Sequence, residues 1–183
     1  NTHGDKWKAK MQAATKHIKF AMRVHRRQHR RGRYFLHEHP ASASSWQLPV
    51  VQSLTSEPGV MTVTIDQCMY GQTTNDGRGG RVPAKKPTTF ATNSAKIAAE
   101  LTLRCNSTHE HVSLMGGRAG QAAIYPPQLC QAICRGLKKQ KRADEEGKGG
   151  LFQASEGEHH HDAAAYDDIS GASFDPVKVS AAR

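Results

Sequence analysis

Cysteine and histidine residues gather in the second half of the sequence, where their side chains could bind a metal ion. Cys105, His109 and His111 lie close together. Cys130 and Cys134 are spaced so that a helix would place both on one face. Thiolates and imidazoles are common zinc ligands, although this spacing matches no common zinc finger. Zinc at Cys105, His109 and His111 is therefore one hypothesis, and free cysteines that pack as small apolar residues are the alternative.

A carboxylate, Glu38, is the second candidate group. It follows the apolar run 34–36, which predicts a buried strand over residues 33–36. Pro40 predicts the end of that strand, and the serines at 42–45 predict the cap of a helix. An acidic side chain at the carboxyl end of a buried strand lies where open α/β sheets carry their functional groups. The alternative is that Glu38 is an ordinary polar residue at a strand end.

The third candidate is a run of cations at the start of the chain. Residues 1–33 contain eleven Lys and Arg against a single acid, Asp5. Apolar residues recur there at steps of three and four, which predicts one helix over residues 5–31. Cations on its other faces can contact phosphates without reading sequence, and a solvated basic surface is the alternative. The candidate nucleic-acid-binding residues are Lys16, Lys19, Arg23, Arg26, Arg27, Arg30, Arg31 and Arg33.

The end of the chain has the opposite charge. Residues 143–183 contain nine acids against three Lys and Arg, within a chain of 183 residues and net charge +10. Few large apolar residues remain after residue 140, which predicts a disordered acidic tail over 141–183 that also carries the histidines 159–161. We therefore expect one domain over 1–140. The charge asymmetry favours a polyanion partner, or a tail that folds back over the basic helix.

The remaining elements indicate an α/β fold in which about three strands, at least partly parallel, are covered by helices. Strands are predicted at 60–65 and 88–92. Helices are predicted at 44–56, 94–103 and 128–140. The stretch 71–87 reads as a loop, and 105–121 has no firm periodicity.

The cellular compartment is inferred from composition. No signal peptide is recognisable and no apolar run reaches membrane-spanning length. We expect an intracellular protein of the nucleus or cytoplasm, with no membrane partner and with reduced cysteines. The first residue is Asn1 rather than Met, which suggests a processed product or a piece of a longer reading frame.

The sequence contains three short motifs that are similar to motifs of a known protein family: HEHP, DQCMYG and KKPTTFATN. Together they resemble the later half of a cytosine-5 DNA methyltransferase catalytic domain. Glu38-His39-Pro40 would match the family's Glu-Asn-Pro, with His39 in place of Asn. Tyr70-Gly71 and Lys86-Pro87-Thr88 would match two later motifs. Residues from about Trp7 to Gly136 also resemble a methylase-like segment of copia-type retroelement polyproteins.

The resemblance implies an incomplete Rossmann-like fold, S-adenosylmethionine as cofactor and nucleic acid as partner. It gives Glu38 the role of binding the Watson–Crick edge of a flipped cytosine. The family's glycine-rich cofactor loop and Pro-Cys nucleophile loop are not found here. The implied function is a retroelement-derived, methyltransferase-like fragment that is not catalytically competent alone, with the rest of its polyprotein as a further partner. The alternatives are a nucleic-acid-binding module that uses the basic helix, and a zinc-stabilised structural protein.

Overall fold

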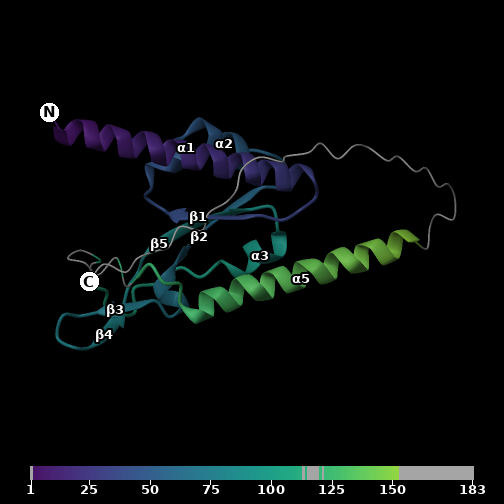
Figure 1. Cartoon of the computed structure of the whole chain (residues 1–183). Helices are drawn as coiled ribbons and strands as arrows, with labels where there is room; N and C mark the ends of the chain where they lie inside the picture. The colour runs from purple at the N-terminus through teal and green to yellow at the C-terminus, as the bar shows by residue number, and fades with distance from the viewer. Residues whose placement is uncertain (1, 113, 115–119, 121, 153–183) are drawn as a thin grey trace, which may run out of the picture.

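A long helix, a three-stranded sheet and a second long helix form the main layers of the molecule (Figure 1). The computed structural model describes residues 2–112, 114, 120 and 122–152. The first helix, α1, spans Thr2–Arg30 and corresponds to the helix expected over 5–31. In the part of the chain that the structure describes, no helix is both long and apolar enough to cross a membrane.

The central sheet contains β1 (Leu36–Pro40), β5 (Pro87–Thr92) and β2 (Met61–Asp66), in the order β1-β5-β2. Both pairings are antiparallel, so the expectation of partly parallel strands is wrong for the described residues. A helical connection between β1 and β2 is typical of adjacent parallel strands. Here β5 lies between those two strands and runs opposite to both. The structure is a mixed α/β fold with small antiparallel sheets, and the Rossmann-like arrangement stays a prediction.

The strand expected at 33–36 begins later than expected. β1 starts at Leu36 and continues through Pro40, paired with β5 from Leu36 opposite Thr92 to Pro40 opposite Thr88. Proline is tolerated because β1 is an edge strand, where a missing N–H interrupts no second ladder. Glu38 therefore lies in the middle of a strand, opposite Phe90, and not after its end.

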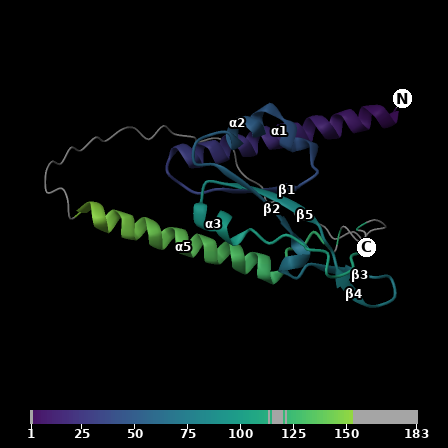
Figure 2. The same cartoon turned by 180° about the vertical axis from the view of Figure 1, so that it is seen from behind.

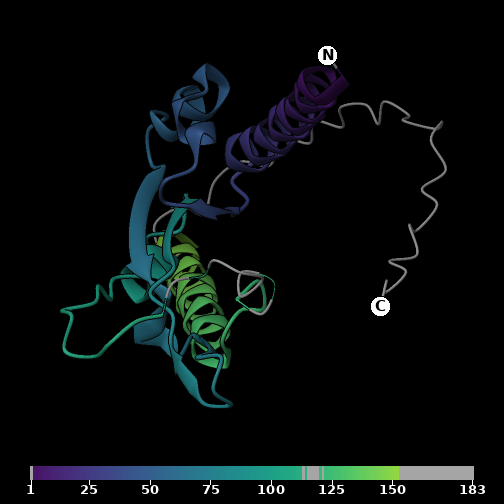
Figure 3. The ribbon, with the colours of Figure 1, turned by 90° about the vertical axis from the view of Figure 1, so that its left-hand side faces the viewer.

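Two short helices follow β1, where one helix over 44–56 was expected. A 3₁₀ turn, η1, covers Ser44–Gln47, and α2 covers Pro49–Thr55 with proline in its first turn. The expected serine cap is not made, because Ala43 and Leu48 occupy the two N-cap positions. α1 and α2 cover one face of the sheet (Figure 3). Their shared core contains Ile18, Met22, Phe35, Val51, Leu54 and Ala91.

The second face of the sheet is covered by α3 (Ala95–Glu100) and α5 (Pro127–Phe152), which lie side by side (Figure 2). Ser94 caps α3 by accepting a hydrogen bond from the N–H of Ile97. This core contains Ile65, Tyr70, Phe90, Ile97, Leu101, Leu129 and Ala132.

α5 overturns part of the expected disordered tail. Residues 141–152 continue the helix, and most residues of its first part, 141–146, are the strong helix formers Lys, Arg, Ala and Glu. Asp144 also accepts hydrogen bonds from Tyr34 at 2.7 Å and from Gln140 at 3.0 Å. The bond from Tyr34 connects this segment of α5 to the residues just before β1. The rest of the predicted tail, including the histidines 159–161, lies outside the described residues.

The stretch 71–87, expected to be a loop, contains a short hairpin. β3 (Thr73–Asn75) pairs with β4 (Arg81–Pro83) in an antiparallel two-stranded sheet. Between β2 and this hairpin lies a 3₁₀ turn, η2 (Gln67–Tyr70), which ends at Gly71 with φ 85°. A left-handed φ at this position favours glycine. The turn therefore redirects the chain from the central sheet to the hairpin.

Candidate metal centre

The two segments that form the candidate metal centre meet at the end of β2. η2 follows β2 directly and carries Cys68. The segment after α3 is held against it by the Tyr70 hydroxyl, which donates to the Glu100 carbonyl at 3.0 Å and accepts from the Leu103 N–H at 3.2 Å. The Asp66 N–H also donates to the Leu103 carbonyl at 3.1 Å. These hydrogen bonds position Cys105 beside η2.

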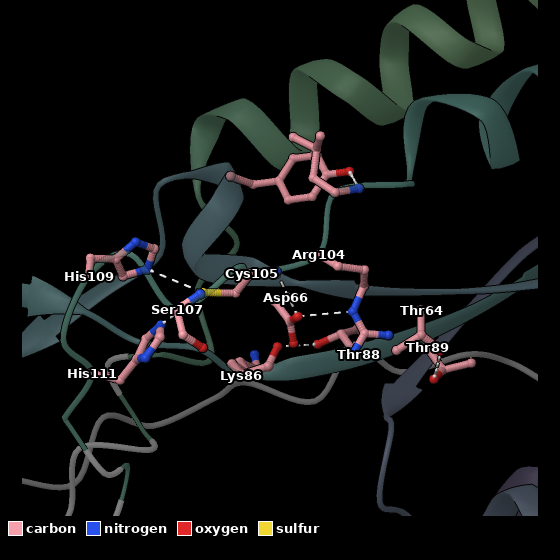
Figure 4. Close-up of polar contacts among 12 residues, drawn as sticks. Thr64, Asp66, Lys86, Thr88, Thr89, Arg104, Cys105, Ser107, His109 and His111 are labelled. Carbon is pink, nitrogen blue, oxygen red and sulfur yellow. Dashed lines mark hydrogen bonds and ion pairs between the residues drawn. The ribbon is translucent and has the colours of Figure 1, made fainter.

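Four ligand atoms converge there. The Cys105 Sγ lies 3.5 Å from the His111 Nε2 and 3.7 Å from the His109 Nε2 (Figure 4). With the Cys68 Sγ, all four atoms lie within 4.8 Å of one another, and all four residues are half-buried. A tetrahedral zinc ion with bonds of about 2.3 Å to sulfur and about 2.05 Å to nitrogen separates these atoms by about 3.6 Å. The cluster can therefore hold a metal ion without large rearrangement.

The loop that carries three of these residues is wound tightly. The Ser107 N–H donates to the Cys105 Sγ at 3.3 Å, and Ser107 has a positive φ of 62°. Asn106 Oδ1 accepts from both the N–H and the hydroxyl of Thr108. An N–H aimed at a cysteine sulfur stabilises the negative charge of a thiolate, which is the ligand form.

A buried carboxylate, Asp66, holds this loop through hydrogen bonds. Asp66 is 1% exposed, and its Oδ2 accepts hydrogen bonds of 2.9 Å from the Cys105 N–H and from Arg104 Nε. Burial raises the pKa of Asp66, but the hydrogen bond from Cys105 and the Arg104 guanidinium outweigh it and hold the pKa below its usual value. A negative charge is thus fixed beside the candidate ligands, where it favours a cation.

This environment shifts the pKa values of two candidate ligands, Cys68 and His111. Burial, followed by the hydrogen bond and charge of Cys105 and the charge of Asp66, raises the pKa of Cys68 to about 11. Burial and the charges of His109 and Lys85 lower the pKa of His111, which keeps its imidazole in the neutral form that binds metals. A divalent cation would reverse the effect on the thiol, because metal binding deprotonates cysteine.

Three of these four residues were expected from the sequence, and Cys68 was not. The sequence-based site used Cys130 and Cys134 as the possible additional ligands, but the structure places both on the exposed surface of α5. The missed signal was the position of Cys68, directly after the clearest strand. The antiparallel sheet brings that strand's exit beside the segment after α3, which sequence spacing alone does not indicate.

Glu38 lies in a different environment from the metal cluster. Burial raises the pKa of Tyr125, and the charge and a hydrogen bond of Glu38 add to this effect. Lys86, the nearby cation, donates to the Ala122 carbonyl at 2.6 Å and lies 5.8 Å from the centre of the Tyr125 ring. Burial lowers the pKa of Lys86, while the charge of Glu38 acts in the opposite direction. Glu38 therefore interacts with a lysine and a tyrosine.

The candidate basic residues of α1 and of the segment just after it have few acidic partners within the part of the chain that the structure describes. Seven of the eight candidates are exposed. Arg26 is the exception, because it is half-buried and its Nε lies 2.5 Å from Glu57 Oε1. The exposed residues are Lys16, Lys19, Arg23, Arg27, Arg30, Arg31 and Arg33.

No protein-family model, curated protein or solved structure matches this chain. Among the described residues, the Cys and His side chains identify a cluster that can hold a metal, and nothing supports binding of S-adenosylmethionine.

Proposed function

We propose that this chain is a zinc-stabilised structural module in which Cys68, Cys105, His109 and His111 bind one Zn²⁺. The observation that carries the proposal is the convergence of four donor atoms within 4.8 Å. Two of the sulfur–nitrogen distances in the cluster, 3.5 and 3.7 Å, are close to the edge of about 3.6 Å that tetrahedral zinc requires.

The ligand types select the metal. Two thiolates and two imidazoles suit zinc, whereas magnesium and calcium prefer oxygen ligands. Four protein ligands fill a tetrahedral shell and leave no position for water or substrate, as in structural rather than catalytic zinc sites. The chemistry that zinc supplies here is therefore cross-linking of the chain.

The cross-link joins two segments that have little regular structure of their own. Cys68 lies in a single 3₁₀ turn, and residues 105–111 contain no helix or strand. Their backbone groups are held by turns and by Asp66 rather than by a ladder of hydrogen bonds. Zinc binding would supply free energy to fix this loop, because binding energy at such a site is also folding energy.

Metal analysis of the purified chain tests the proposal. We expect about one zinc per chain, and loss of zinc in Cys105→Ser and in His111→Asn. The matched control replaces the two exposed cysteines, Cys130→Ser and Cys134→Ser, and should keep its zinc. Cobalt substitution gives a second readout, since sulfur-to-cobalt charge transfer should appear in the control and weaken in Cys105→Ser. Stoichiometric zinc that persists in both ligand variants would rule out this site.

The methyltransferase-like function stays a prediction from the sequence resemblance. Glu38 is the residue that it assigns to catalysis, and calorimetry with S-adenosylmethionine is its direct test. We expect no measurable heat of binding, because the glycine-rich cofactor loop of that family is not found in the sequence. A saturable heat would restore the methyltransferase-like hypothesis.

A further inference from the structure

α1 has two opposite faces of different character. One face packs on the sheet through Ile18 and Met22, which are 7% and 0% exposed. At 100° per residue, Arg23 and Arg27 lie on the opposite side of the helix. Arg31 follows in the turn after α1, where its N–H donates to the Arg27 carbonyl at 3.2 Å, and all three arginines are exposed. The docked face thus fixes the helix and turns the arginines towards solvent.

Contacts at the end of α1 hold this orientation. Arg26 Nη2 donates to the Ser53 hydroxyl at 3.0 Å, in addition to its ion pair with Glu57. The ring of His29 lies 3.0 Å from the Pro58 carbonyl through Nε2 and 3.1 Å from Asn93 Nδ2 through Nδ1. The arginine face therefore belongs to an anchored element, which reduces the entropy lost when it binds a partner.

The arginines form one surface rather than scattered charges. An open groove on the C-terminal half of α1 is lined by Arg23, Arg26, Arg27, Arg30 and Arg31. Among the described residues, Arg26 alone of these five has a carboxylate within ion-pair distance. Guanidinium groups stay charged at all physiological pH values and bind phosphate in a two-pronged geometry. The other four guanidiniums, which have no carboxylate within ion-pair distance in the described part of the chain, fit a ligand with several phosphates.

We propose that this arginine face binds the phosphate backbone of duplex DNA. The inference is independent of the zinc centre. α1 has 29 residues, so it is about 43 Å long and, with its side chains, about 10–12 Å wide. The B-form major groove is about 12 Å wide and admits a helix, whereas the A-form groove of duplex RNA is deep and narrow. α1 lies on the outside of the molecule, with the sheet on one side of it (Figure 1), so a duplex can approach the arginine face, which is turned away from the sheet.

An anionic membrane is the less suitable partner. A helix that lies on a membrane buries an apolar face among the lipids while its cations contact the headgroups. The apolar residues of the C-terminal half of α1, Ile18 and Met22, are already buried against α2 and the sheet. On the arginine side, α1 exposes two apolar side chains, Phe20 and Val24, which is a small apolar area for a helix that lies on a membrane.

Salt-dependent DNA binding by matched variants tests the proposal. The test variant combines Arg23→Gln, Arg27→Gln and Arg31→Gln. The control removes the same charge from the exposed surface of α5 through Lys138→Gln, Lys141→Gln and Arg142→Gln. Each lost phosphate contact reduces the magnitude of the slope of log K against log salt by about 0.9. We therefore expect this slope to be smaller by about 2.7 in the test variant and unchanged in the control.

The measurement is fluorescence anisotropy of a labelled DNA duplex titrated with the full chain. Helix content by circular dichroism and zinc content should be unchanged in both variants, which separates a binding defect from misfolding. Equal losses in test and control variants would show that net charge alone drives binding and would overturn the inference. Tighter binding to duplex RNA, to single-stranded DNA or to anionic vesicles would overturn the choice of partner.

Discussion

Asp66 is the residue that joins the fold to the candidate metal centre. Its backbone ends β2, and its carboxylate holds the N–H of a candidate ligand, Cys105. The second oxygen, Oδ1, is buried and has no hydrogen-bond partner among the described residues. A fully buried carboxylate is costly unless its charge is compensated. The nearby Arg104 compensates in part, and a metal ion bound at the adjacent cluster would add to this effect.

Asp66→Asn tests this supporting role. Asparagine has the same size, and its amide oxygen can still accept from Cys105, but the negative charge is lost. We expect zinc affinity to fall by about 10- to 100-fold, as for other residues that orient metal ligands. Chelator competition measures the affinity. The control is Asp5→Asn, which removes the same charge from the exposed surface of α1 and should leave the affinity unchanged. Equal effects of the two variants would contradict a special role for the carboxylate.

His37 makes the stability of the fold depend on pH. Burial, together with the charges of His25 and His39, lowers the pKa of His37 from 6.5 to about 4. Its ring also contacts the rings of His25 and Trp46, so it lies between α1, β1 and η1. The unfolded chain binds the proton first as pH falls. The stability due to the neutral ring is therefore complete above about pH 6.5 and is lost between pH 6.5 and 4.

Urea unfolding at pH 7 and pH 5 measures this effect. We expect the wild-type free energy of unfolding to fall by about 1–2 kcal/mol more than that of His37→Gln, after allowance for the partial exposure of the ring. The variant is the necessary control, since the candidate metal ligands also bind protons in this range. Parallel pH profiles of the two proteins would show that His37 does not contribute.

At the scale of elements, α3 and α5 pack closely against each other at Gly136 of α5. A Cβ added at Gly136 would lie 2.6 Å from the Ile97 Cα and 2.9 Å from the Lys96 carbonyl oxygen. Both are backbone atoms, so the helices must move apart to accept a side chain. The close approach of α5 to α3 therefore requires glycine at this position.

Gly136→Ala is expected to destabilise the chain by about 1–3 kcal/mol, because overpacking outweighs the gain of about 1 kcal/mol in helix propensity. The matched control is Gly147→Ala in the same helix, where no atom lies within 4 Å of the added Cβ. That variant should be neutral or slightly stabilised. Thermal unfolding compares the two, and an equal effect of both substitutions would contradict the packing argument.

Helices with a clear apolar stripe could be predicted from the sequence, whereas strand order could not. The stripe of α1 and the run that forms α5 are local patterns, and both helices are present. The position of β5 between β1 and β2 depends on contacts between distant residues, which no local pattern records. The apolar run 34–36 predicts the strand too early, because β1 consists of Leu36 and the polar residues that follow it, and it ends at Pro40 as expected. The predicted helix ends at 140 because few large apolar residues follow, although the Lys, Arg, Ala and Glu residues just after that position favour a helix.

At the scale of the whole molecule, the candidate zinc centre and the arginine face lie on different layers. The first ties the exit of β2 to the loop after α3, and the second lies on α1, on the other face of the sheet. Three of the four candidate ligands could be predicted from residue type, whereas Cys68 joins them only through the three-dimensional fold. Separate variants should therefore affect metal content and DNA binding independently.

Zinc K-edge X-ray absorption of the purified full chain measures the central claim most directly, because it counts the ligand atoms around the metal. We predict two sulfur ligands at about 2.3 Å and two nitrogen ligands at about 2.0–2.1 Å, with one of the sulfurs lost in Cys68→Ser. A shell of oxygen and nitrogen atoms alone, or a spectrum unchanged by Cys68→Ser, would contradict the proposed centre.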